Sequence, residues 1–244
     1  MSDDVQDITF AQITAIDFNK FFWDRHYNGK NLKEAERVGQ ISMMDGVIAQ
    51  YTGELPMLIE AIEESKGKDD AWSKIDYTIA SVSLFVIMTM ADIVVTSKYF
   101  LLADKDYDKR VLRGKLMVIL NEGFKKLYGF NDDNRKESEW ARLESIMEHF
   151  PEIIILQQKQ LTSLLEDISK KDTWWKNDRN VETHMDAEGL YASRSEEIVE
   201  SKVMMDSMRL FDALLAVIHF LKNVQGCVVN FLVAKYYKGE LKDK

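Results

Sequence analysis

Proline and glycine are scarce in this chain, with two prolines and eleven glycines in 244 residues. Both residue types mark turns, so their scarcity favours long helices over a many-stranded sheet. A single cysteine, Cys227, excludes an internal disulfide and fits a reducing compartment. The first ten residues, MSDDVQDITF, are acidic where a signal peptide would be basic. We therefore expect a cytoplasmic protein.

Several kinds of chemistry lack the residues they need. The sequence contains no Gly-rich phosphate loop and no Gly-x-Ser-x-Gly nucleophile motif. It also contains no Glu-x-x-His or His-x-x-x-His pair, the spacings by which helices ligate metals, so neither a metal nor a cofactor is predicted. The net charge of −9 argues against broad binding to nucleic acid, whose phosphates favour a basic surface. A local basic site is still compatible with that charge.

Apolar residues recur at helical spacing along most of the chain, which predicts an all-α bundle of about seven or eight helices. The longest expected helices cover residues 31–51, 72–103, 106–128, 152–170 and 195–237. A polar run at residues 65–70 is the predicted boundary between two parts of the chain. These parts are an N-terminal helical extension, residues 1–66, and a helical bundle, residues 69–244.

The most apolar segment covers residues 72–103. A membrane-spanning helix needs about 18 to 20 uncharged residues, and the stretch between Asp76 and Asp92 is shorter than that. We therefore predict a buried central helix and no contact with a membrane. Asp92 is expected to be a buried or half-buried carboxylate on this helix, with Lys98 as one candidate partner.

Reactive residue types gather in residues 170–189, KKDTWWKNDRNVETHMDAEG, outside the apolar stripes. Arg179 carries a permanent charge and a fork of donors suited to phosphate. His184 is the residue type that exchanges protons near neutral pH. Asn177 and Asp178 are cap and turn formers, and a helix beginning near them would direct free N–H groups toward an anion.

Basic and aromatic residues precede this pair. Two indole rings could stack on bases, and the cationic side chains around them could contact phosphates. The predicted RNA-binding residues are Lys170, Lys171, Trp174, Trp175 and Lys176.

The segment RNVETH, residues 179–184, resembles the motif of the HEPN superfamily of nucleotide-binding helical domains. The ribonucleases of that family carry Arg, a polar residue, three variable positions and His, which Arg179, Asn180 and His184 match. The order of helices, motif and long final helix is also similar to the family over residues 69–237. The resemblance implies metal-independent RNA cleavage, an up-and-down helical core and a homodimer whose two motifs face each other.

The same resemblance implies a role for each motif residue. His184 would transfer the proton, Arg179 would stabilise charge on the phosphate, and Asn180 would orient the histidine or contact the phosphate. Family members often act as toxins or abortive-infection effectors that a partner protein controls.

A non-enzymatic class competes with the ribonuclease. The acids Glu182, Asp186 and Glu188 crowd His184, where they would keep it protonated and repel phosphate. The alternative is therefore a helical protein-interaction module in which the motif is decayed or coincidental.

Overall fold

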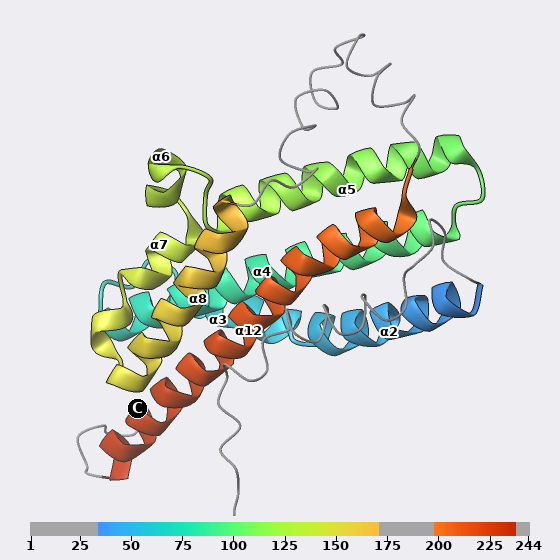
Figure 1. Cartoon of the computed structure of the whole chain (residues 1–244). Helices are drawn as coiled ribbons and strands as arrows, with labels where there is room; N and C mark the ends of the chain where they lie inside the picture. The colour runs from blue at the N-terminus through green and yellow to red at the C-terminus, as the bar shows by residue number, and fades with distance from the viewer. Residues whose placement is uncertain (1–33, 171–197, 238–244) are drawn as a thin grey trace, which may run out of the picture.

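The computed structural model describes residues 34–170 and 198–237 of the chain. All regular elements within these ranges are helices, and no strand occurs there, so the predicted all-α bundle is confirmed (Figure 1). They are α2 (Glu34–Thr52), α3 (Leu55–Ser65), α4 (Ala71–Leu102), α5 (Asp106–Leu127), α6 (Asp132–Lys136), α7 (Glu139–Glu144), the 3₁₀ helix η2 (Met147–His149), α8 (Glu152–Lys170) and α12 (Glu200–Tyr237).

Helix α4 lies at the centre of the bundle. It begins where the Asp70 side chain accepts a hydrogen bond from the Ser73 backbone N–H at 2.9 Å. Its flanks pack against α2, α3, α5 and α12 (Figure 1). Among the described helices, α4 alone is long and apolar enough to cross a membrane, and 61% of its apolar window is buried by the other helices. This burial agrees with the predicted central helix.

Helices α2 and α3 cover one flank of α4. Pro56 lies in the first turn of α3, where its missing N–H costs nothing. Gly67 has a positive φ of 76°, which lets the chain turn sharply toward α4. Both α2 and α3 contact α4. The division of the chain into residues 1–66 and 69–244 stays a prediction.

The prediction that Asp92 is buried or half-buried was wrong. Asp92 is exposed, because it lies on a strip of α4 that α2, α5 and α12 leave uncovered. Lys98 instead places its Nζ atom 2.6 Å from Oδ1 of Asp45 on α2. This ion pair links the C-terminal half of α4 to the middle of α2.

Helices α7, α8 and α12 form the other side of the core. The fully buried Trp140 donates from its indole nitrogen to the Thr162 hydroxyl at 3.0 Å. Its ring centroid lies 6.3 Å from that of Phe220 on α12. Aromatic contacts of this kind contribute about 0.5–1.5 kcal/mol beyond the burial of apolar area. They hold α7, α8 and α12 together at one end of the bundle.

Candidate functional site

The segment that contains the RNVETH motif lies outside the described residues. This applies to the predicted catalytic residues Arg179, Asn180 and His184 and to the predicted RNA-binding residues Lys171, Trp174, Trp175 and Lys176. Lys170 is described: it is the last residue of α8 and is exposed. Its Nζ atom lies 3.6 Å from a carboxylate oxygen of Glu166, one helical turn earlier.

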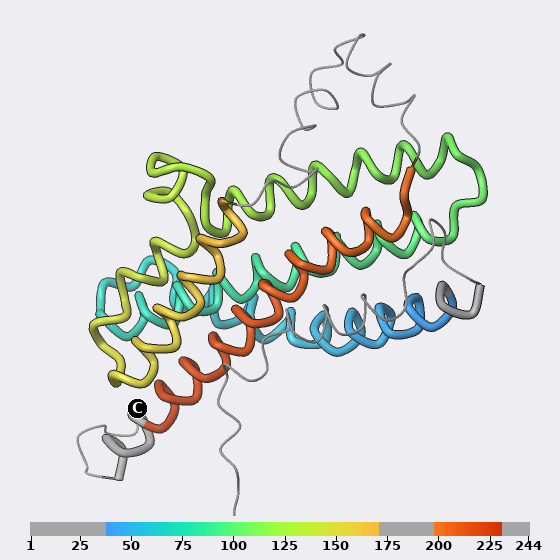
Figure 2. Tube along the Cα trace, in the orientation of Figure 1, coloured from blue at the N-terminus to red at the C-terminus, as the bar shows by residue number. Residues whose placement is uncertain are grey.

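The two helices that flank the motif segment are well packed. Leu161 and Leu165 of α8 are buried, and α8 packs along α12. At the start of α12, the buried carboxylate of Glu200 forms an ion pair with Lys109 of α5. Figure 2 shows the end of α8 and the start of α12 toward opposite ends of α5.

A polar cluster joins α12 to the corner between α2 and α3. The Tyr51 hydroxyl lies 3.2 Å from Nε2 of His219. Lys222, one turn further along α12, donates to Oε1 of Glu54 at 2.6 Å, and its Nζ lies 5.0 Å from the centre of the Tyr51 ring. The cluster brings together residues 168 positions apart in the sequence.

Burial and neighbouring charges shift the pKa values of two groups in this cluster. Burial of Tyr51, followed by the nearby Glu54 carboxylate, raises the pKa of the phenol. Partial burial of the imidazole and the charge on Lys222 lower the pKa of His219. Both groups are therefore neutral at pH 7, and they share one hydrogen bond whose direction depends on the histidine tautomer. In the structure, this bond fixes α12 against α2.

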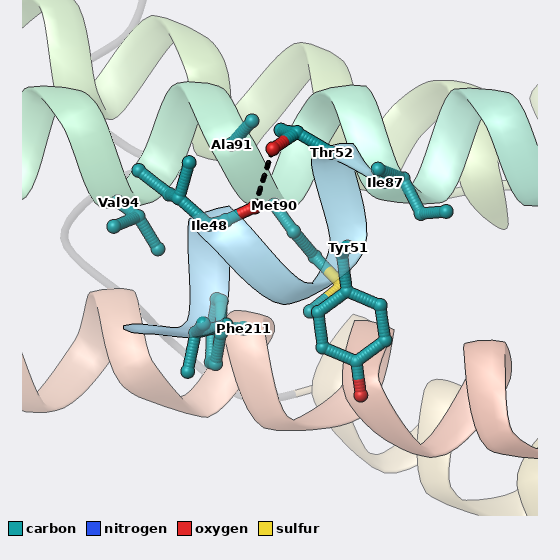
Figure 3. Close-up of a pocket in the computed structure, with 9 residues that line it drawn as sticks. Ile48, Tyr51, Thr52, Ile87, Met90, Ala91, Val94 and Phe211 are labelled. Carbon is teal, nitrogen blue, oxygen red and sulfur yellow. Dashed lines mark hydrogen bonds between the residues drawn. The ribbon is translucent and has the colours of Figure 1, made fainter. Parts of the chain in front are cut away.

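A small hollow opens beside Tyr51 where α2, α4 and α12 meet (Figure 3). It encloses about 180 Å³, including the part open to solvent, whereas ligand pockets usually hold about 300 Å³ or more. Its lining is Val47, Ile48, Tyr51, Thr52, Ile87, Met90, Ala91, Val94 and Phe211. The Thr52 hydroxyl donates back to the Ile48 carbonyl at 2.6 Å and so offers its proton to no ligand. We interpret the hollow as imperfect helix packing.

Besides Glu200, two further buried carboxyl groups lie on α12, those of Asp206 and Asp212. Asp206 is paired with Arg209 at 2.8 Å, although burial still raises the pKa of its carboxyl group. Burial raises the pKa of Asp212 to about 8, and its Oδ2 atom has no hydrogen-bond partner. Asp212 is therefore a neutral acid at pH 7.

Sequence reasoning missed the partner of His219 and the burial of Asp212. The His219 ring bonds Tyr51 of a distant helix, and no pattern in the sequence pairs these two residues. A signal for Asp212 does exist, because it is the one charged residue in the apolar run LFDALLAVIHF, residues 210–220. A helix that is apolar on several faces is buried on several faces, so an isolated acid within such a run is a candidate for burial.

Metal binding finds no support in the described ranges, where no three His, Cys, Asp or Glu side chains gather as a metal site would require. No protein-family model matches the chain, and neither a curated protein nor a solved structure matches it. Its function is therefore inferred from its own residues.

Proposed function

We propose that the chain is a HEPN-like, metal-independent endoribonuclease that cleaves RNA through Arg179 and His184 in a homodimer. The observation that carries the proposal is the RNVETH motif, residues 179–184, whose Arg, polar and His positions match the family pattern. An all-α bundle with a long helix after the motif segment is the architecture that the resemblance implies. A toxin or abortive-infection effector controlled by a partner protein is the role that accompanies it.

The proposed reaction is an internal transesterification of RNA. The ribose 2′-oxygen bonds to the adjacent phosphorus while the bond from phosphorus to the 5′-oxygen breaks. His184 transfers a proton to or from the reacting oxygens, and Arg179 stabilises charge on the non-bridging phosphate oxygens. Asn180 orients the histidine or contacts the phosphate. The products carry a 2′,3′-cyclic phosphate and a 5′-hydroxyl, and no metal is needed.

RNA would approach along the basic and aromatic residues that precede the motif. Lys170 and Lys171 supply positive charge, and Trp174 and Trp175 supply surfaces on which bases can stack. The exposure of Lys170 at the end of α8 is compatible with a phosphate contact, since its ion pair with Glu166 is a weak surface pair.

The deciding experiment compares wild type, His184→Ala and Arg179→Ala on RNA in the presence of EDTA. We expect wild type to release 2′,3′-cyclic phosphate ends and to leave RNA with 2′-O-methyl groups intact. His184→Ala should slow cleavage on the order of 10²- to 10⁴-fold because it removes the proton carrier. Arg179→Ala should cost about 10²- to 10³-fold through lost charge stabilisation.

His149→Ala is the matched control, because His149 is an exposed histidine of η2 outside the motif. It should cleave like wild type, and all variants should keep wild-type helicity by circular dichroism. The same four proteins should rank identically in toxicity on expression. If wild type cuts no RNA and is not toxic, or if His184→Ala cuts equally well, the helical protein-interaction module is the better reading.

A further inference from the structure

One strip of α4 is exposed along the C-terminal half of the helix. Its members are Met88, Asp92, Val95, Tyr99 and Leu102, and the four large hydrophobic side chains among them are each 42–58% exposed. Their spacings of four, three, four and three residues place all five on one helix face. This is the spacing of positions that pack against another helix.

Helices α2 and α5 lie on either side of this strip. Lys98 faces α2, where it pairs with Asp45, and α5 lies against Thr89 through Gly123. On α2, Val38 lies two helical turns before Asp45 on the same face and is 57% exposed, so the apolar surface extends onto that helix. Within the described part of the chain, no helix covers the strip.

The chain that precedes α2 joins the bundle beside one end of the strip. Asp45 pairs with Lys98. Thr52, further along α2, lines the hollow with Ala91, which lies earlier in α4, so the two helices are antiparallel. Glu34 lies eleven residues before Asp45, or about 16 Å along α2, which takes it past the end of α4. Figure 1 shows the start of α2 at the same end of the bundle as the connection from α4 to α5.

The sequence of residues 8–23 matches the strip in length and in spacing. Apolar residues are separated there by three, four, three and four positions, so a helix would align them on one face over about 21 Å, which is also the length of the strip. Each of them lies 80 or 81 positions before one strip residue, so two parallel helices would keep the sets in register. These residues are Ile8, Ala11, Ala15, Phe18 and Phe22.

We propose that residues 8–23 form a helix that packs on the strip, parallel to α4. The turn formers Asn28 and Gly29 lie between this helix and α2, where the chain has to reverse its direction. Ten residues separate Trp23 from Glu34, which is ample for two helices whose axes lie about 9 Å apart. The proposal holds whether or not the chain cleaves RNA.

The facing positions are complementary in size at both ends of the strip. Phe22 meets Leu102 at one end, and Ile8 meets Met88 at the other. In the middle, the short side chain of Ala15 lies against Val95, so the two helices can approach closely.

The C-terminal tail suits the strip less well. Residues 238–244, KGELKDK, contain five charged residues among seven, and Leu241 is their one large apolar side chain. Such a segment cannot bury the apolar residues of the strip.

Pairs of introduced cysteines, with the native cysteine changed to serine, test the packing. Ala15→Cys with Val95→Cys should form an intramolecular disulfide under mild oxidation, because facing positions of packed helices bring their Cα atoms within about 6 Å. Phe22→Cys with Leu102→Cys should do the same. Ile8→Cys with Leu102→Cys is the matched control and should stay reduced, since these positions would be about 21 Å apart. Peptide mass spectrometry identifies each linkage.

Every other pattern of cross-links counts against the proposal. A disulfide between Ile8→Cys and Leu102→Cys would show an antiparallel arrangement or no fixed register. A disulfide from Ala15→Cys to Val95→Cys of another molecule would assign the strip to a second copy. No disulfide in any pair would leave the strip to residues 171–197 or to a membrane.

Hydrogen exchange of the full chain provides a second readout. Peptides from residues 8–23 should be protected in wild type, and Val95→Glu should make them exchange at least about tenfold faster, because the new carboxylate resists burial. Peptides from α12 should be unchanged, since Val95 is exposed on the strip. The matched control is Leu156→Glu, at a position of α8 that is 51% exposed, and it should keep residues 8–23 protected.

Unprotected residues 8–23 in wild type, or protection that survives Val95→Glu, would overturn the proposal. Should Val95→Glu fail to fold, the cysteine pairs decide the question alone. His184→Ala should keep the wild-type protection of residues 8–23, which separates this test from the test of RNA cleavage.

Discussion

Asp212 lies on α12 where burial deprives a carboxylate of its hydration. Only 7% of the residue is exposed, and its Oδ2 atom accepts no hydrogen bond. The charged form is therefore disfavoured, and the pKa rises to about 8 from the ordinary value of 3.8. In the unfolded chain, the same carboxyl group ionises near its ordinary pKa.

This difference predicts a pH dependence of stability. Between about pH 4 and pH 8, the folded chain holds a proton on Asp212 that the unfolded chain has lost, so the free energy of unfolding falls by about 1.4 kcal/mol per pH unit from this group. Above pH 8 the contribution levels off. Asp212→Asn removes the titration, so its stability advantage over wild type should grow from pH 5 to pH 8. Urea unfolding at each pH measures it, and parallel curves would contradict the prediction.

At the scale of elements, α4 and α5 are in close contact at Gly123. A Cβ atom added to Gly123 would lie 2.7 Å from Cγ2 of Thr89, which is closer than two carbon atoms can pack. The Thr89 hydroxyl is held by the Phe85 carbonyl at 2.9 Å, so the side chain cannot easily turn away. The absence of a side chain at Gly123 therefore sets the separation of the two helices.

Gly123→Ala should destabilise the fold by about 1–3 kcal/mol through overpacking, despite the better helix propensity of alanine. Adding Thr89→Ser should recover much of that loss, because serine keeps the hydroxyl and lacks the Cγ2 atom. Chemical denaturation of both single variants and the double variant gives the coupling energy.

Gly46→Ala on α2 is the control for this cycle, since an added Cβ would meet nothing within 4 Å. It should raise stability by up to about 1 kcal/mol. Additive effects of Gly123→Ala and Thr89→Ser would show that the close contact does not limit the packing of α4 on α5.

At the scale of the whole molecule, α4 joins the helices into one core. It contacts α2 and α3 on one flank and α5, α7 and α12 on the others. Buried residues of these helices belong to one continuous apolar cluster, from Met44 on α2 to Val224 on α12. Loss of any one of these helices would expose part of α4.

We therefore expect residues 34–170 and 198–237 to unfold in one transition. Urea curves from far-ultraviolet circular dichroism, which reports all helices, should coincide with tryptophan fluorescence, which includes the buried Trp140. Low protein concentration keeps dimerisation out of the comparison. Two separated transitions would instead support independent folding of the predicted extension, residues 1–66.

The sequence by itself determined the helical class and the course of the longest helices. The helix predicted over residues 152–170 is α8, and the one predicted over 106–128 is α5 within one residue. These features are local: a 3.6-residue period marks a helix, and Gly129, with its φ of 88°, marks where α5 stops. The RNVETH motif is also local in sequence. The ribonuclease site built on Arg179 and His184 stays a prediction.

Only the tertiary structure decided which side of each helix is covered. Asp92 and Asp212 are both acids on long apolar helices, yet the first is exposed and the second buried. The bond from His219 to Tyr51 likewise joins residues 168 positions apart. Periodicity specifies one apolar face of a helix, but the number of neighbours that pack around it depends on residues far away in the chain. Burial, partners and pKa values follow from that packing.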